Sequence, residues 1–387
     1  MKTLSAAPLL LLITLFASAC SDPNAVDDSD DGDGNLGALP TSVASPAANP
    51  TSPQKVQLGK LLFWDPLLSG ARDVACATCH HPNSGYAENL DLSIGVGGIG
   101  LSASRRFASA AHGPFVKRNT PTVLNTAFNG MNVNGVYDPA TAPMFDDIRV
   151  RSLELQSLKP MVTAEEMRGS AYTEAAALDS IVGRLKKIAM YRELFATAFG
   201  EGDISSPRIS QAIAAFERTL VTTDSPFDRF MRGETDAMTE QQKRGMAEFT
   251  RVGCNACHSG PMFSDFRTHV IGVDNNAKLG SVDNGTNGTF AFRTLSLRNL
   301  RHTAPYMHNG TLASLPDVIT FYNQARGRGN RGGRGQANGV ALDPQMPRDV
   351  DNAADLIAFL DALSSDGFDM SAPASVPSGL SVGGNIR

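Results

Sequence analysis

Two short motifs of cysteine and histidine carry the clearest chemistry in this chain of 387 residues. The first motif reads Cys76-Ala-Thr-Cys79-His80 and the second reads Cys254-Asn-Ala-Cys257-His258. In this frame two thiols add across the vinyl groups of one haem, and the adjacent histidine ligates its iron. Zinc sites need two cysteine pairs within ~15–20 residues of each other, and redox cysteine pairs need no following histidine. We therefore expect two covalently bound haem c groups.

The N-terminus has the features of an export signal. Lys2 precedes an apolar run of twelve residues, from Pro8 to Ala19, which is too short to cross a bilayer. Cys20 follows, and two interpretations stay open: Cys20 is the lipidated first residue of a mature lipoprotein, or signal peptidase cleaves after Ala19. The first is favoured because an unpaired cysteine is otherwise unusual in an exported protein. Residues 1–20 are predicted to be a signal peptide, and the protein to be periplasmic, with membrane contact only through a lipid anchor.

The formal net charge of -5 comes from one segment. Residues 21–50 contain six aspartates and no lysine or arginine, whereas residues 51–387 carry equal numbers of acidic and basic side chains. A neutral body gives no support for nucleic-acid binding. A hydrophobic fraction of 42% excludes a disordered chain. We expect residues 21–50 to be an acidic flexible tether.

Caps and apolar spacing predict helices in the body of the chain. One begins at Ser52-Pro53 and ends at Trp64. Another begins at Ser206-Pro207, and Thr239 opens a third with a capping box. Asp351 is expected to cap a last helix. No alternation typical of strands is sustained, so the predicted class is mainly α with long loops.

The same pattern suggests how the chain divides. A boundary is expected near Thr222 to Ser225, between a first haem domain over residues 51–222 and a second over 223–363. Residues 364–387 lack periodicity and are predicted to be a disordered tail. The Arg/Gly-rich segment 326–339 is expected to be a solvated flexible loop, with docking of an acidic protein partner as the weaker alternative.

The residues around the two motifs resemble those of the bacterial dihaem cytochrome c peroxidase superfamily, which includes the MauG-type enzymes. The resemblance covers about residues 51–363 and implies two mainly helical, cytochrome c-like domains whose haems face a shared interface. The MauG-like branch is favoured. The residues that carry it are Leu58-Gly-Lys-Leu-Leu-Phe-Trp-Asp-Pro-Leu-Leu-Ser-Gly70, Arg118-Asn-Thr-Pro-Thr-Val-Leu-Asn125, Ala215-Phe-Glu-Arg-Thr-Leu220, Pro226-Phe-Asp-Arg229, Leu297-Arg-Asn299 and Ala304-Pro-Tyr-Met-His-Asn-Gly310.

The first haem is expected to react with peroxide only if one axial position is open or can open. Resting peroxidases of the family close it with a histidine sixteen residues after the motif's own, and counting from His80 places Val96 there. Valine cannot ligate iron, so the resemblance favours an open site. His112 remains an alternative ligand when the count runs backwards from the Arg118 motif, and a histidine with no ligand role is the third interpretation.

The resemblance also implies the distal residues of this first site. Glu166 matches the acid/base that takes the proton of peroxide and returns it to the leaving oxygen. Gln156 matches the hydrogen-bond donor that orients peroxide, and Pro160 matches a further pocket position. Glu165 is the neighbouring alternative to Glu166.

At the second haem, the family places methionine fourteen residues after the histidine of a Tyr-x-His-x-Gly motif. Counting from His308 reaches Tyr322, with Met346 and Met307 as alternative ligands. A phenolate stabilises higher oxidation states of iron, whereas methionine favours the ferrous state. The family's tryptophan between the haems falls near Phe145-Asp146, and the only tryptophan of this chain is Trp64.

The expected function is reduction of H2O2 at a five-coordinate haem, with electrons relayed through a second His/Tyr haem. The donor is a small cytochrome c or cupredoxin. Two alternatives remain: MauG-type oxidation of a side chain on a partner protein, and a dihaem electron carrier without catalysis. The resemblance further implies a Ca2+ ion bound by Asn119 and the backbone carbonyls of Thr303 and Pro305.

Overall fold

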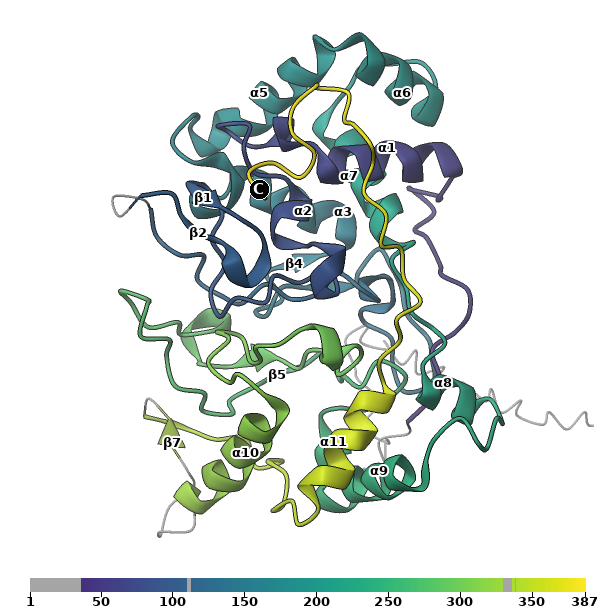
Figure 1. Cartoon of the computed structure of the whole chain (residues 1–387), viewed down its shortest axis with the longest axis vertical. Helices are drawn as coiled ribbons and strands as arrows, with labels where there is room; N and C mark the ends of the chain where they lie inside the picture. Colours follow the sequence, from purple (N-terminus) through teal and green to yellow (C-terminus); the bar gives the residue numbers. More distant parts are fainter. Residues whose placement is uncertain (1–35, 110–112, 330–335, 338) are drawn as a thin grey trace, which may run out of the picture. The chain divides into compact units, whose positions relative to one another are not determined.

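The chain is mainly α-helical with little sheet, as the sequence predicts (Figure 1). The computed structural model describes residues 36–109, 113–329, 336–337 and 339–387. The predicted signal peptide, Cys20 and His112 lie outside these residues. In the described part of the chain, no helix combines the length and the apolar character needed to cross a bilayer.

Eleven helices lie in the described residues, joined by long loops: α1 Pro53–Trp64, α2 Cys76–Cys79, α3 Leu153–Gln156, α4 Lys159–Val162, α5 Glu174–Lys186, α6 Ala189–Phe199, α7 Ser206–Glu217, α8 Pro226–Met231, α9 Glu240–Val252, α10 Leu315–Gly329 and α11 Ala353–Ala362. Sheet is limited there to antiparallel pairs of two-residue strands. The pairs are β1 Gly98–Ile99 with β2 Arg106–Phe107, β3 Pro143–Met144 with β4 Val150–Arg151, β5 Thr268–His269 with β6 Phe292–Arg293, and β7 Gln336–Ala337 with β8 Val340–Ala341.

Most of the predicted helix starts are confirmed. Ser52 caps α1 by accepting a hydrogen bond from the backbone N–H of Lys55, and Thr239 forms the expected capping box at the start of α9. The prediction for α11 is wrong by one residue, since Asn352 is its N-cap. The side chain of Asp351 instead forms an ion pair with Arg251, 2.9 Å away.

Two large apolar clusters form the core. One is built mainly from residues 58–220 and the other from residues 227–363, on either side of the expected boundary. In each cluster a glycine lets two helices approach closely. A Cβ on Gly59 of α1 would collide with the carbonyl of Ala212 on α7, and one on Gly245 of α9 would collide with that of Asp355 on α11. The assignment of one haem domain to each cluster stays a prediction.

The C-terminal segment contradicts the prediction of a disordered tail. After α11 the chain runs back to the helices of the first cluster (Figure 1). Val376 is buried there, the N–H of Gly383 donates to the carbonyl of Trp64 at 2.8 Å, and Asp369 forms an ion pair with Lys60 at 2.6 Å. Its apolar residues contact the core from an irregular backbone, so they have no period for a sequence analysis to detect.

The predictions of flexibility for the tether, residues 21–50, and for the Arg/Gly-rich segment, residues 326–339, are each wrong for part of the segment. In the tether, Leu39 and Asn49 are buried, and the N–H of Leu39 donates to Asp228 at 2.9 Å. The aspartates end at Asp33 and apolar residues follow, so the second half of the segment can pack. In the Arg/Gly-rich segment, α10 continues as far as Gly329 before the undescribed residues begin.

Candidate active site

The first motif forms one turn of helix, α2, which brings Cys76, Cys79 and His80 to one cavity. The Nδ1 atom of His80 lies 3.0 Å from the carbonyl oxygen of Tyr86. A carbonyl can only accept, so Nδ1 carries the proton and Nε2 keeps a free lone pair. Burial lowers the pKa of His80, which keeps the ring neutral. A neutral ring held in this tautomer is the form that ligates iron.

The second motif repeats this arrangement. Cys254 begins a short 3₁₀ turn over Cys254–Ala256 and Cys257 follows it, and the Nδ1 atom of His258 lies 3.0 Å from the carbonyl oxygen of Phe263. Burial lowers the pKa of His258 as well. The four cysteines of the two motifs are free thiols, not disulfide partners. Both motifs therefore have thiols and an oriented imidazole ready for haem attachment.

Both motifs line one continuous cavity of about 710 Å³. Cofactor sites typically have volumes of ~300–1,000 Å³ and mostly apolar walls. Here Leu153, Met262 and Leu297 contribute to an apolar lining between the polar groups. The cavity and the donor atoms along it fit the two haem groups that the motifs predict.

The expected distal residues of the first site line this cavity together. Gln156 ends α3, Pro160 lies in α4, and Glu166 lies in a π-helical turn over Ala164–Arg168. Burial raises the pKa of Glu166 to about 7, with Arg149 opposing the rise and the nearby Glu165 carboxyl making a smaller contribution to it. Such a pKa suits a group that accepts and returns a proton near neutral pH.

Val96 lies beside this turn and does not line the cavity. Its backbone N–H donates to the carbonyl of Glu165 at 3.4 Å. Close to it, a Cβ on Gly95 would collide with the carbonyls of Glu165 and Glu166. The segment that carries Val96 is thus packed directly against the segment that carries the expected acid/base.

At the second motif, all three candidate axial ligands, Tyr322, Met346 and Met307, line the cavity. Burial raises the pKa of the Tyr322 phenol, and the thiols of Cys254 and Cys257 lie near enough to raise it further. A phenol in this setting ionises only beside a cation such as ferric iron. Which of the three residues ligates the iron stays a prediction.

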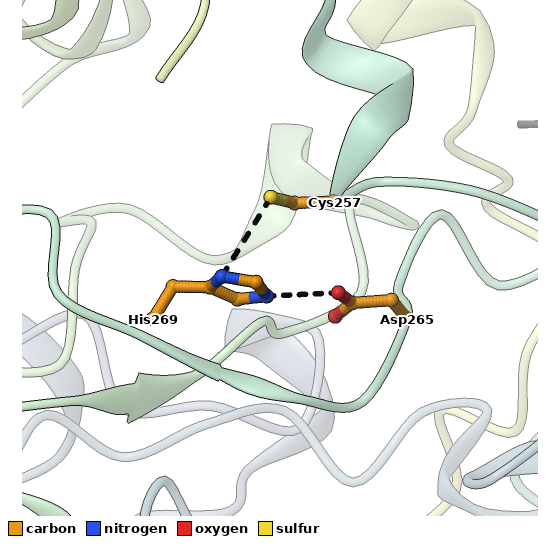
Figure 2. A group of neighbouring side chains, drawn as sticks. All are labelled: Cys257, Asp265 and His269. Carbon is orange, nitrogen blue, oxygen red and sulfur yellow. Dashed lines mark hydrogen bonds and ion pairs between the residues drawn. The ribbon is translucent and has the colours of Figure 1, made fainter. Parts of the chain in front are cut away.

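Next to the second motif, Cys257, Asp265 and His269 form a cluster of the kind that can hold a metal ion (Figure 2). The imidazole of His269 uses both nitrogens, however: Nε2 lies 2.8 Å from Asp265 and Nδ1 lies 2.6 Å from Asp343. The bond to Asp265 is the main reason that the pKa of His269 is raised to about 11. A protonated imidazole offers no lone pair, so the cluster is better described as a histidine held between two carboxylates.

Charged side chains join the parts of the cavity wall that come from residues 51–222 and from residues 223–363. Arg118 forms ion pairs with Asp283 at 2.7 Å and with Asp147 at 2.9 Å. The backbone N–H of Arg293 donates to the carbonyl of Asp146 at 2.6 Å. Segments from the two halves of the chain are thus fixed against each other between the motifs.

The position expected for the family's tryptophan also lies on this wall. Phe145 lines the cavity, and the guanidinium of Arg149 stacks 3.6 Å from the centre of its ring. Trp64, by contrast, is buried and packs against His81, the neighbour of the first motif's histidine. The cavity therefore has no indole at the expected position.

The three residues predicted to bind Ca2+ line the same cavity. The side-chain amide of Asn119 donates to the carbonyl of Leu90 at 2.6 Å, and its backbone N–H donates to that of His308 at 2.9 Å. Thr303 and Pro305 contribute to the wall, but nothing here tests them as ligands. The Ca2+ site stays a prediction.

Sequence reasoning missed two groups at the site. One is His269, whose imidazole lies between two carboxylates. Asp265 is four residues away in the chain, whereas Asp343 is 74 residues away. The other is Glu217, a buried carboxyl on the cavity wall near Cys76. Glu217 belongs to a motif that carried the family resemblance, and a carboxylate within an apolar helical stretch is the signal that could have identified it.

Comparisons with known proteins agree with this geometry. A family model described as di-haem cytochrome c peroxidase matches residues 53–236. The chain is 37% identical over 333 residues to the methylamine utilization protein MauG of Methylorubrum extorquens, covering 84% of this chain and 83% of that protein. It is 31% identical over 370 residues to the cytochrome c551 peroxidase of Pseudomonas aeruginosa, covering 92% and 91%.

Among solved structures, the fold is similar to that of a MauG-like protein associated with microbial copper homeostasis. The TM-score is 0.65 at 27% sequence identity, and the match covers 87% of this chain and 95% of that one. The resemblance stated from sequence motifs therefore extends over most of the chain.

Proposed function

We infer the function of this chain from the premise that it belongs to the di-haem cytochrome c peroxidase family. Peroxidases and MauG proteins are its relatives, so a dihaem oxidoreductase is the supported class. The specific function inferred is reduction of H2O2 by a periplasmic enzyme of the MauG-like branch. The observation that carries it is the cavity on which both motifs and a carboxyl with a pKa near neutrality converge.

Haem attachment is the first part of the proposal. Cys76 and Cys79 hold one haem and Cys254 and Cys257 the other, with His80 and His258 as the iron ligands. When bound, the haems supply one iron that reacts with peroxide and a second that holds or passes electrons. The hydrogen bonds from both Nδ1 atoms to backbone carbonyls support this assignment, because they direct Nε2 to the iron.

Proton transfer at the first site is assigned to Glu166. Its carboxylate takes a proton from one oxygen of H2O2 and returns it to the other, so that water leaves. Gln156 supplies a hydrogen bond that orients the peroxide, and Val96 contributes no atom that could block the iron. The pKa of about 7 supports this role, since both protonation states are then accessible.

The second site is assigned to electron storage and relay through Tyr322. An anionic oxygen ligand stabilises the more oxidised states of the iron. The buried phenol beside both thiols of the motif supports this ligand over Met346 and Met307. The same observation favours a second candidate function, oxidation of a side chain on a partner protein, for which oxidising equivalents must be stored.

The remaining parts of the proposal concern the surroundings of the enzyme. Electrons come from a small cytochrome c or a cupredoxin. The protein is anchored to the membrane through lipid on Cys20. Ca2+ between Asn119, Thr303 and Pro305 stabilises the contact between the two haem sites.

The test is a spectrum of the ferric protein before and after stoichiometric H2O2, repeated with Tyr322→Met. We expect a high-spin EPR signal from the first site, loss of that signal with peroxide, and a long-lived oxidised state only when Tyr322 is present. Two low-spin signals without a high-spin component would eliminate the open site. An unchanged Soret band after addition of peroxide would mean that the protein is an electron carrier without catalysis.

A further inference from the structure

A second acid lies on the cavity wall, apart from the residues assigned to peroxide. Glu217 is the last residue of α7, is only 4% exposed and lines the cavity with Cys76. Its Oε2 atom is buried and has no hydrogen-bond partner in the part of the chain that the structure describes. Buried carboxyl oxygens are nearly always satisfied, so an unpartnered one beside a cofactor cavity requires an explanation.

The nearest cation does not neutralise Glu217. Arg218 follows it in the chain, but its guanidinium pairs with Glu154 at 2.8 Å. Glu154 also accepts a hydrogen bond from Asn49, and no hydrogen bond joins Arg218 to Glu217, although Nε and Nη1 of Arg218 also have no hydrogen-bond partner in the described part of the chain. Around them, Ala214, Leu153 and Met144 form an apolar cluster that offers no donor.

Another buried carboxyl near the first motif shows the contrast. Glu88 accepts a hydrogen bond from Thr120 at 3.2 Å and lies 3.6 Å from the guanidinium of Arg105. It does not line the cavity, whereas Glu217 does. Oε1 of Glu88 also has no hydrogen-bond partner in the described residues, but Arg105 lies beside it as an ion-pair partner, and no ion pair of Glu217 is found there.

The surroundings of Glu217 favour its neutral form. Burial raises the pKa of its carboxyl to about 8, Arg218 opposes the rise and Glu154 adds to it. Cys76 is the other titratable group near it, and its thiol is consumed when haem is attached. An uncompensated buried carboxylate is strongly disfavoured, so the group loses its proton when further positive charge appears nearby.

We propose that Glu217 is a redox-linked proton carrier of the first haem site, which releases its proton into the cavity when that site is oxidised and recovers it when the site is reduced. The inference rests on the proposed function, because it requires a haem at the first motif. It adds a residue that acts separately from Glu166.

The proton balance shows what this carrier does. Reduction of one H2O2 to two H2O consumes two electrons, which the donor protein supplies, and two protons. The proton that Glu217 releases when the site is oxidised is one of these two. When the donor's electrons reduce the site, solvent supplies the second proton and also reprotonates the Glu217 carboxylate. The residue returns to its starting state in each cycle, and the charge of the buried site stays nearly constant while electrons enter and leave.

Infrared difference spectroscopy of the full-length holoprotein, oxidised minus reduced, tests the proposal directly. We expect a band from a protonated carboxyl that disappears in Glu217→Gln and shifts in Glu217→Asp, which keeps the acid. Glu88→Gln is the matched control and should retain the band. An identical difference spectrum in the wild type and Glu217→Gln would overturn the proposal.

The reduction potential of the first haem gives a second readout, measured between about pH 6 and 9, around the pKa of Glu217. Glu166 and Glu88, whose pKa values burial raises to about 7, titrate in the same range, so the comparison is made in a Glu166→Gln/Glu88→Gln background. The potential should fall with rising pH when Glu217 is present and become flat with Glu217→Gln. An equal slope in both proteins contradicts the proposal. A missing high-spin signal would instead refute the open site, without touching this proton linkage.

Discussion

The two halves of the cavity carry the same predicted motif for haem attachment and differ in the side chains around it. In each half, a histidine follows two cysteines and donates from Nδ1 to a backbone carbonyl at 3.0 Å. The first half adds the buried carboxyls of Glu166 and Glu217, while the second adds the phenol of Tyr322 and an imidazole held between carboxylates. Attachment therefore does not decide the chemistry of a site; the neighbouring side chains do.

The difference follows one physical rule. Burial without a partner keeps a carboxyl protonated near neutral pH, and such a group can exchange protons. A phenol, in contrast, loses its proton to solvent when its oxygen binds a metal cation, and the phenolate then stabilises positive charge on the metal. The first half is suited to moving protons and the second to holding electrons.

The largest effect is expected from Glu166→Gln, which removes the proton carrier and keeps the shape. General acid–base catalysis contributes ~10²- to 10⁴-fold, so the rate of reaction with H2O2 should fall within that range. The rate is measured by stopped-flow from the Soret change. Glu165→Gln is the matched control and should stay near the wild-type rate. If the two variants reverse this order, Glu165 is the acid/base.

The pH dependence of the rate of reaction with H2O2 tests the role of Glu166 in the first half of the cavity. Burial raises the pKa of Glu166 to about 7, so below that pH the group is protonated and cannot accept the peroxide proton. The rate should therefore rise about tenfold per pH unit up to pH 7 and level off above it. A midpoint near the ordinary value of 4.5 would contradict the buried acid. Glu166→Gln should lose this dependence.

A smaller effect is expected in the second half from Asp343→Asn. The change removes one of the two carboxylates that hold His269 and leaves a weaker hydrogen bond. Hydrogen bonds to charged groups contribute ~1.5–3 kcal/mol, so we expect a loss of about 1 kcal/mol in the free energy of unfolding. Thermal unfolding measures it, with Asp349→Asn as a surface control. The peroxide rate at the first site should not change, and a large loss there would mean that the halves are not separable.

The sequence predicted the parts of the fold that rest on local signals. The caps at Ser52 and Thr239 and the helices α7 and α11 depend on residues within one or two turns, and the structure has them. The tail was missed because Val376 is buried by long-range contacts of an irregular backbone. The packing of Leu39 was missed for the same reason, since its partner Asp228 is far away in the sequence.

The sequence by itself determined the two frames in which haem can be attached, because the chemistry of thioether attachment requires one local frame of residues, and it predicts His80 and His258 as the iron ligands. It also determined, through the family resemblance, which residues to examine around the iron. Only the tertiary structure decided that Glu166, Gln156, Glu217 and both motifs line one cavity, and that His269 lies between two carboxylates. The pKa of a side chain depends on burial and on charges from distant segments, and no local pattern contains that information.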